Sequence, residues 1–169
     1  MSIAPKGQDI RFSEDRIEQG RNFCNKLWNV SRFRTLSGST SGNQSVTEIL
    51  SRIQPGQIKD EDAAILIRLK VTIDEVETSY QNYEFNSVLH AIYKFFWSDF
   101  CDWYVEDSKK RIKVEASKET CLAFQDFCLR EILLLLHPFT PFITEELWTL
   151  LGFSDGNSIQ SIAPMSSTG

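Results

Sequence analysis

The chain has 169 residues, 41% of them hydrophobic and 24% charged, which is the length and balance of one folded domain. Its apolar runs are too short to cross a bilayer, and the N-terminus lacks the basic start and apolar core of a signal peptide. We therefore expect a cytoplasmic protein without membrane contact. The net charge of −5 disfavours nucleic-acid binding by the whole surface.

The positive charge is concentrated near the N-terminus. The first 34 residues carry seven Lys and Arg against four Asp and Glu, a balance of +3, whereas the remainder carries −8. An anionic partner should therefore contact this N-terminal segment, or the short basic run at 108–113.

The four cysteines show no CxxC pair and no histidine at ligand spacing; they are Cys24, Cys101, Cys121 and Cys128. All four fall within helical patterns, where a free cysteine behaves as a small buried hydrophobe. We predict structural thiols, with neither a metal site nor a disulfide.

Helical periodicity begins in the first forty residues. A first helix is predicted from about Ser13, an N-cap residue followed by two acids, to about Phe33. The Ser-, Thr- and Gly-rich stretch 35–59 is predicted to be a surface loop with a short helical piece at 46–53.

Three further helices are predicted, from about Asp60, over 85–106 and over 116–136. The second helix should bury Ala63, Ile67, Ile73, Val76 and Tyr80. The third should bury Phe85, Leu89, Ile92, Phe96, Phe100 and Trp103. The fourth should bury Cys121, Phe124, Cys128, Ile132 and Leu135.

The stretch "LHPFTPFITEELW" at 136–148 interrupts the most apolar part of the chain. Pro138 should push His137 out of the α region and end the fourth helix. Thr140 and Pro141 then suit the N-cap and first position of a last helix, which Gly152 should stop. The sequence thus predicts an all-α, mostly antiparallel bundle of about five helices.

No catalytic constellation is visible, and we predict no catalytic residue. His137 is expected to be a corner residue bonded to nearby backbone. His90 should lie opposite the main stripe of its helix, beside Trp97 and Tyr104, on a face that packs on another helix. Asp99 falls among apolar positions, so we expect it to pair with an arginine or an indole N–H.

The first helix carries two distinguishable faces at about 100° per residue. Its packed face is predicted to centre on Gly20, Cys24, Leu27 and Ser31, with small residues allowing close approach. The flanks of this face are Ile17 and Trp28 on one side and Phe23 and Val30 on the other. Within an arc of about 80° beside it lie Arg21, Asn25, Asn29 and Arg32. Such residues can bind base edges and phosphates, although a solvated helix face remains the alternative.

Three segments of the chain together resemble valyl-tRNA synthetases, in the helical anticodon-binding domain of these class I enzymes. The segments are "GQDIRFSEDRIEQGRNFCNKLWNVSRF" at 7–33, "FNSVLHAIYKFFWSDFCDWYVEDSK" at 85–109 and "LHPFTPFITEELW" at 136–148. The segments occur in the same order as in these enzymes, and the resemblance covers nearly the whole chain. The stretches "RNFCNKLWN" and "FCDWY" are more similar to the valyl enzymes than to isoleucyl or leucyl relatives.

The resemblance implies a domain that positions valine tRNA for ATP-dependent valylation by a parent enzyme. By this resemblance Asn29 and Arg32, then Arg21, Asn25 and Trp28, would contact the anticodon. The two ATP-site signatures have no counterpart here, so no cofactor is expected in this chain, while ATP and magnesium would serve the parent. Alternatives are a protein-interaction module without RNA binding, or the same domain of another class I synthetase.

The resemblance also suggests a division of the chain. Residues 1–12 would be a linker from the catalytic domain of the same chain, 13–153 the helical domain, and 154–169 a tail leading towards a coiled coil. Besides valine tRNA, the catalytic domain is the expected partner, and the protein is expected to be a monomer.

Overall fold

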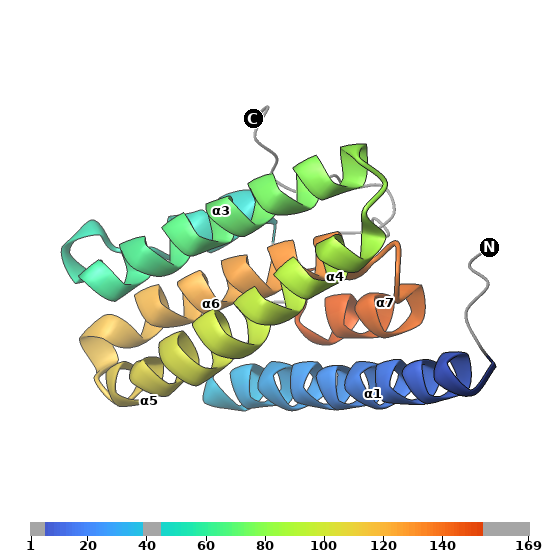
Figure 1. The fold of residues 1–169 in the computed structure, drawn as a ribbon. Coiled ribbons are helices and arrows are strands. Elements are labelled where there is room, and N and C mark those ends of the chain that lie inside the picture. The colour runs from blue at the N-terminus through green and yellow to red at the C-terminus, as the bar shows by residue number, and fades with distance from the viewer. Residues whose placement is uncertain (1–5, 39–44, 154–169) are drawn as a thin grey trace.

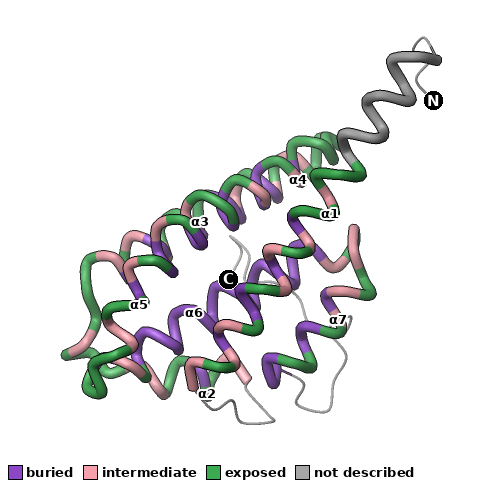
Figure 2. The backbone as a smooth tube through the Cα atoms, turned by 90° about the horizontal axis from the view of Figure 1, so that it is seen from below, coloured by how far each residue is buried: buried purple, intermediate pink, exposed green. Residues whose placement is uncertain are grey.

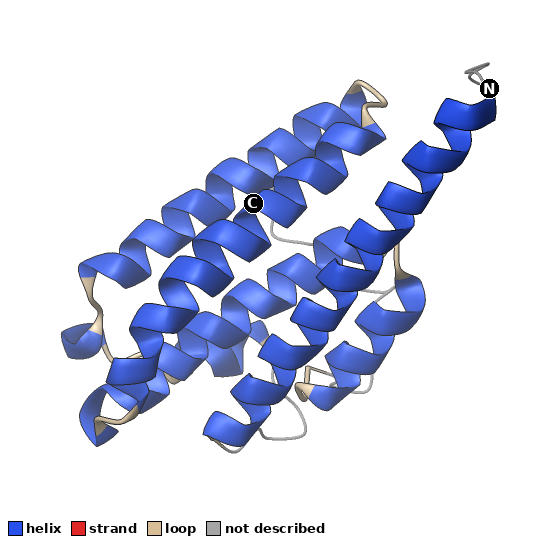
Figure 3. Ribbon diagram, turned by 60° about the horizontal axis from the view of Figure 1, so that its bottom comes forward, coloured by secondary structure: helices blue, strands red, loops and turns tan. Residues whose placement is uncertain are grey.

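The computed structural model describes the backbone of residues 6–38 and 45–153, with side chains from residue 17 onward. Every regular element in these ranges is helical (Figure 3). The elements are α1 (Lys6–Ser37), α2 (Val46–Ser51), the 3₁₀ turn η1 (Pro55–Gln57), α3 (Asp60–Gln81), α4 (Phe85–Lys94), the π-helix η2 (Phe95–Val105), α5 (Glu106–Ile112), α6 (Glu115–Leu136) and α7 (Pro141–Leu150). Since α4, η2 and α5 continue without a break, five long helical segments result, and the predicted all-α bundle is confirmed. None of the described helices is long and apolar enough to span a membrane.

Helix α6 is the centre of the bundle and contacts every other element described. Figure 1 shows α3 above it and α1 with α7 below it, while the α4–η2–α5 segment runs in front of it and approaches α1 at α5. Residues 120–136 are buried without interruption (Figure 2). All five residues predicted for its apolar stripe are buried. The residues on the other sides of the helix are buried as well, because α6 is covered by neighbouring helices all round and has no solvent face there.

Two predicted details of the first two long helices are wrong. Helix α1 begins at Lys6 and not near Ser13, because the residues just before Ser13 mostly tolerate a helix and the chain reaches a proline only at Pro5. Helix α3 does begin at Asp60, but Ala63, Ile67 and Tyr80 on its predicted core side are exposed. Its core side carries Asp62, Ile65, Leu69, Thr72, Ile73 and Val76.

The middle of the third predicted helix has π geometry, which changes which residues face the core. The wider π turns bring residues four apart into line, and the rings of Phe96, Phe100 and Tyr104 stack at centroid spacings of 6.1 and 6.2 Å. Tyr104 is therefore fully buried, whereas Trp103 is only partly buried. The predicted stripe assumed α-helical spacing, so it included Trp103 and left Tyr104 to the opposite face. Phe85, the first residue of that stripe, is exposed.

The α6–α7 corner forms in a different way from that predicted. His137 keeps αR geometry, with φ −51° and ψ −43°, and its N–H bonds to the Leu133 carbonyl at 2.9 Å. The proline rule is a preference, and here the backbone hydrogen bond outweighs it. Thr140 does occupy the N-cap and Pro141 the first helical position, but the Thr140 hydroxyl donates to the Leu136 carbonyl at 3.3 Å.

Helix α7 ends as the sequence predicts, at a glycine in left-handed geometry. Gly152 has φ 79°, and its N–H and that of Phe153 bond to the carbonyls of Thr149 and Trp148. The same pattern closes α3, where the residue in left-handed geometry is Tyr83, with φ 59°.

Two buried ionic networks tie the helices together. The Arg34 Nη2 donates to Asp126 Oδ2 at 2.7 Å, and Arg34 Nε lies 2.6 Å from Asp126 Oδ1. Arg52 Nη1 reaches the same carboxylate at 2.9 Å, which joins α1, α2 and α6. In the second network Asp62 accepts hydrogen bonds from Arg111 and Tyr104, which joins α3 to η2 and α5.

Tyr83 provides a test of the α3 ending. A tyrosine with positive φ is strained, and its side chain is 81% exposed, so little packing would be lost on removal. We expect Tyr83→Gly to raise the free energy of unfolding by about 0.5–1 kcal/mol, measured by urea denaturation. Tyr83→Ala should give no such gain, and an equal gain from both would contradict the backbone explanation.

Asp62 should make stability depend on pH. Burial by itself raises the pKa of Asp62, but hydrogen bonds from Arg111, a backbone N–H and Tyr104 outweigh it and lower the net pKa. Its ionised form therefore stabilises the fold above the ordinary aspartate pKa of about 3.9, and this contribution is lost on acidification.

The variant Asp62→Asn should lower the free energy of unfolding by roughly 3 kcal/mol near pH 7, because it leaves Arg111 without its anion. The difference between wild type and variant should stay constant above about pH 5 and shrink below about pH 4. Urea denaturation across this range measures it, and a difference independent of pH would contradict the assignment.

Candidate nucleic-acid interface

The packed face of α1 is set by apolar residues and one buried arginine. Phe23, Leu27 and Val30 are buried in the core, and Arg34 is fully buried on the same side. Leu27, Ser31, Phe23 and Val30 of the predicted face are buried, as predicted, but its centre was placed too close to Gly20 and Cys24, and Ile17 is exposed. Gly20 is partly exposed, and a Cβ built there would have no neighbour within 4 Å, so it permits no close helix approach.

The four polar residues predicted on α1 share one exposed face, opposite the packed one. Arg21, Asn25, Asn29 and Arg32 are all exposed, and their side chains form no hydrogen bond or ion pair with the part of the chain that the structure describes. We call these four residues the polar stripe. A stripe with no internal partners is available to a ligand, but its binding role stays a prediction.

Trp28 lies between the polar stripe and the core. Its side chain is partly buried and packs against the core cluster, while part of it remains accessible. The structure therefore brings all five predicted contact residues onto one helix, and Trp28 differs from the other four in also stabilising the fold.

A hollow lies between α1 and α7, beside the polar stripe. Its volume is about 390 Å³, within the range of small-ligand sites. It is lined by Cys24, Asn25, Trp28, Phe142, Ile143 and Glu146. We call it the α1–α7 hollow. Asn25 and Trp28 thus belong both to the predicted contact residues and to this hollow.

The α7 wall of the hollow was not foreseen. Phe142 and Ile143 both fit the apolar pattern that predicts the last helix, but Phe142 is 88% exposed. At about 100° per residue, Ile143 lies on the same side of the helix as Leu147, and the adjacent Phe142 lies on a different side. This spacing already indicates in the sequence that Phe142 is a surface residue. Glu146 follows it by one helical turn on the same side.

The hollow is chemically mixed. Burial raises the pKa of the Cys24 thiol, which therefore stays neutral near pH 7. Glu146 is the one carboxylate among the lining residues, and among the described residues it makes no ion pair. An aromatic ring, an amide, a neutral thiol and a carboxylate together suit a flat polar ligand better than a phosphate.

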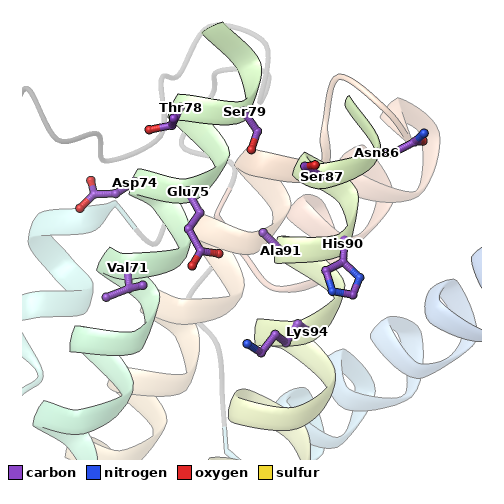
Figure 4. Close-up of a pocket in the computed structure, with 10 residues that line it drawn as sticks. All are labelled: Val71, Asp74, Glu75, Thr78, Ser79, Asn86, Ser87, His90, Ala91 and Lys94. Atoms are coloured by element: carbon purple, nitrogen blue, oxygen red, sulfur yellow. The ribbon is translucent and has the colours of Figure 1, made fainter. Parts of the chain in front are cut away.

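A second, larger hollow lies between α3 and α4, with a volume of about 680 Å³. Figure 4 shows Asp74 and Glu75 coming from α3, and His90 and Lys94 from α4. The two carboxylates make this hollow unfavourable for a polyanion. His90 is exposed here, so the prediction that its face packs on another helix is wrong for this residue.

The remaining polar residues that the sequence singled out have structural partners. His137 Nδ1 lies 2.9 Å from the Thr144 hydroxyl, so it is a corner residue bonded to a side chain instead of backbone. Asp99 accepts from Arg68 at 3.3 Å, which confirms the expected arginine partner. Arg68 also stacks over Trp103 at 4.3 Å.

The other three cysteines are buried, as predicted for structural thiols. Burial raises the pKa of Cys101 to about 12, so this thiol is un-ionised near neutral pH. Within the described residues no group of three His, Cys, Asp or Glu side chains could hold a metal ion.

Residues 62–167 match the family described as "Anticodon-binding domain of tRNA ligase". The match covers more than half of the sequence. The chain belongs to this family.

Relatives of this domain include valine–tRNA ligases from three bacteria. The chain is 37% identical to that of Aquifex aeolicus over 171 residues, covering 93% of this chain and 14% of the relative. It is 40% identical to the valine–tRNA ligase of Thermotoga maritima over 152 residues, covering 88% of this chain and 16% of the relative. For the enzyme of Geobacillus kaustophilus the identity is 41% over 161 residues, covering 94% of this chain and 17% of the relative. The chain thus spans about one sixth of the length of these relatives.

The exposed position of the polar stripe gives a prediction about stability. Asn25→Ala and Asn29→Ala remove no internal bond and introduce a better helix former, so each should change the free energy of unfolding by less than about 0.5 kcal/mol. Leu27→Ala, on the opposite face, should lower it by about 2–5 kcal/mol. Thermal melts measure all three, and an equally large loss at Asn29 would show that the stripe is structural.

Proposed function

We propose that this chain is the anticodon-binding domain of a valine–tRNA ligase. In this role it holds the anticodon loop of valine tRNA, while other parts of the same enzyme join valine to that tRNA with ATP and magnesium. The observation that carries the proposal is the polar stripe. In a member of an anticodon-binding family, Arg21, Asn25, Asn29 and Arg32 are exposed and unengaged among the described residues.

The chemistry of the stripe suits an RNA loop. Anticodon bases are unpaired, so their edges can bond to the amides of Asn25 and Asn29. Arg21 and Arg32 can pair with phosphates or stack on bases. The part of the chain after residue 34 is acidic, with a balance of −8, so it should repel the tRNA backbone and keep the contact narrow.

The proposal includes the organisation of the longer enzyme. Residues 1–12 would connect the domain to the catalytic domain of the same chain, and 154–169, which lie outside the described residues, would lead to a following segment. The domain would act as a monomer in the cytoplasm. The identity of 37–41% to valine–tRNA ligases supports the valine assignment over another class I synthetase.

Binding to anticodon stem-loops tests the function. The 169-residue chain should bind the stem-loop of valine tRNA more tightly than a noncognate stem-loop, measured by fluorescence anisotropy at several salt concentrations. Asn29→Ala should weaken valine stem-loop binding by about 1–3 kcal/mol without changing the salt dependence. Arg32→Ala should weaken binding to both loops and reduce the salt slope by about one.

A matched control separates site effects from the loss of one positive charge. Lys70→Ala removes an exposed cation from α3, away from the stripe, and should leave binding unchanged. Wild-type binding that does not distinguish the two loops would contradict the valine assignment. Absence of binding to either loop would favour a protein-interaction module instead.

A further inference from the structure

The α1–α7 hollow lies beside the polar stripe and includes a second helix, α7. The inference drawn from it rests on the proposed function. The α1 wall of the hollow contains Asn25 and Trp28, and its α7 wall contains Phe142 and Glu146. A base that leaves the anticodon loop beside the stripe would meet this hollow next. Its volume of about 390 Å³ is large enough to hold one base.

Phe142 offers an unusual surface for such a base. Its side chain is the most exposed among the large hydrophobic residues described, at 88%. An exposed phenyl ring gains nothing from the fold but presents a flat face on which a base can stack. Phe142 is the second residue of α7, directly after the N-cap Thr140 and Pro141. Its backbone is therefore fixed in helical geometry, and this sets the position of the ring.

Glu146 gives the hollow a preference among bases. A carboxylate accepts hydrogen bonds but cannot donate them, so it favours a base edge that carries an amino group. Cytosine, adenine and guanine have such a group, whereas uracil has none and offers the anion a single N3–H between two carbonyl oxygens. The same negative charge disfavours a phosphate in the hollow, while Asn25 can bond to either kind of edge.

We propose that the α1–α7 hollow receives one unpaired anticodon base, that Phe142 is its stacking platform, and that Glu146 selects an amino-bearing base against uracil. Neither α7 residue belongs to the polar stripe, so the reading surface extends from one helix to two. The α6–α7 corner gains a function in this way, because it sets where the α7 wall stands relative to α1.

The first test is the stacking platform. Phe142→Ala should weaken binding of the valine anticodon stem-loop by about five- to a hundred-fold, and Phe142→Tyr should retain it. Ile67→Ala removes a similarly exposed apolar side chain from α3 and should have no effect. Thermal melts should be unchanged, because Phe142 contributes little buried surface.

The second test is base selection. Each amino-bearing anticodon base of the stem-loop is replaced in turn by uracil, and the ratio of the two Kd values is measured. At one position the wild-type ratio should be about tenfold or more. Glu146→Gln should reduce that ratio several-fold, because an amide can also donate to uracil. Glu75→Gln, in the hollow between α3 and α4, should leave it unchanged.

The outcomes separate the two proposals. Wild type that does not prefer the valine stem-loop would overturn the proposed function, and with it this inference. Wild type that prefers the valine loop, with Phe142→Ala and Glu146→Gln both behaving like wild type, would overturn the hollow alone. Loss of stacking with unchanged base ratios would overturn the role of Glu146.

Discussion

The carboxylate of Asp126, fully buried in α6, determines how the surrounding helices are arranged. A buried anion is costly unless it is paired, and here Arg34 from the end of α1 and Arg52 after α2 both reach it. Arg34 contributes a hydrogen bond from Nη2 at 2.7 Å and a close ion-pair contact of Nε at 2.6 Å, and two contacts constrain direction as well as distance. Helix α1 therefore has one rotational setting against α6.

That setting decides which face of α1 meets solvent. Arg34 lies roughly half a turn around the helix from the polar stripe, at about 100° per residue. Burying Arg34 with Phe23, Leu27 and Val30 consequently turns Asn25 and Asn29 outward. The internal ion pair and the exposed amides are thus two results of the same rotation, and changing the first would redirect the second.

Helix α7 is positioned by the same central helix. Trp148 is 1% exposed, Arg130 of α6 stacks over its ring at 5.5 Å, and Phe153 contacts it edge-on at 5.2 Å. These contacts hold the inner face of α7 and leave Phe142 and Glu146 on its outer face beside α1. The bundle is packed around α6, while the polar stripe and the α1–α7 hollow lie on the two helices at one side.

The sequence by itself determined the succession of helices and the position of the α6–α7 corner, because periodicity and turn residues are local properties of the chain. The family followed from the resemblance of three segments. The sequence also predicted which residues of α1 form a polar line, since their spacing is helical. Only the tertiary structure decided that Asp62 and Asp126 are buried, that Ile67 and Phe142 are exposed, and that π turns bury Tyr104. These outcomes depend on which helix packs where, and residues distant along the chain, such as Arg34 and Asp126, set that arrangement.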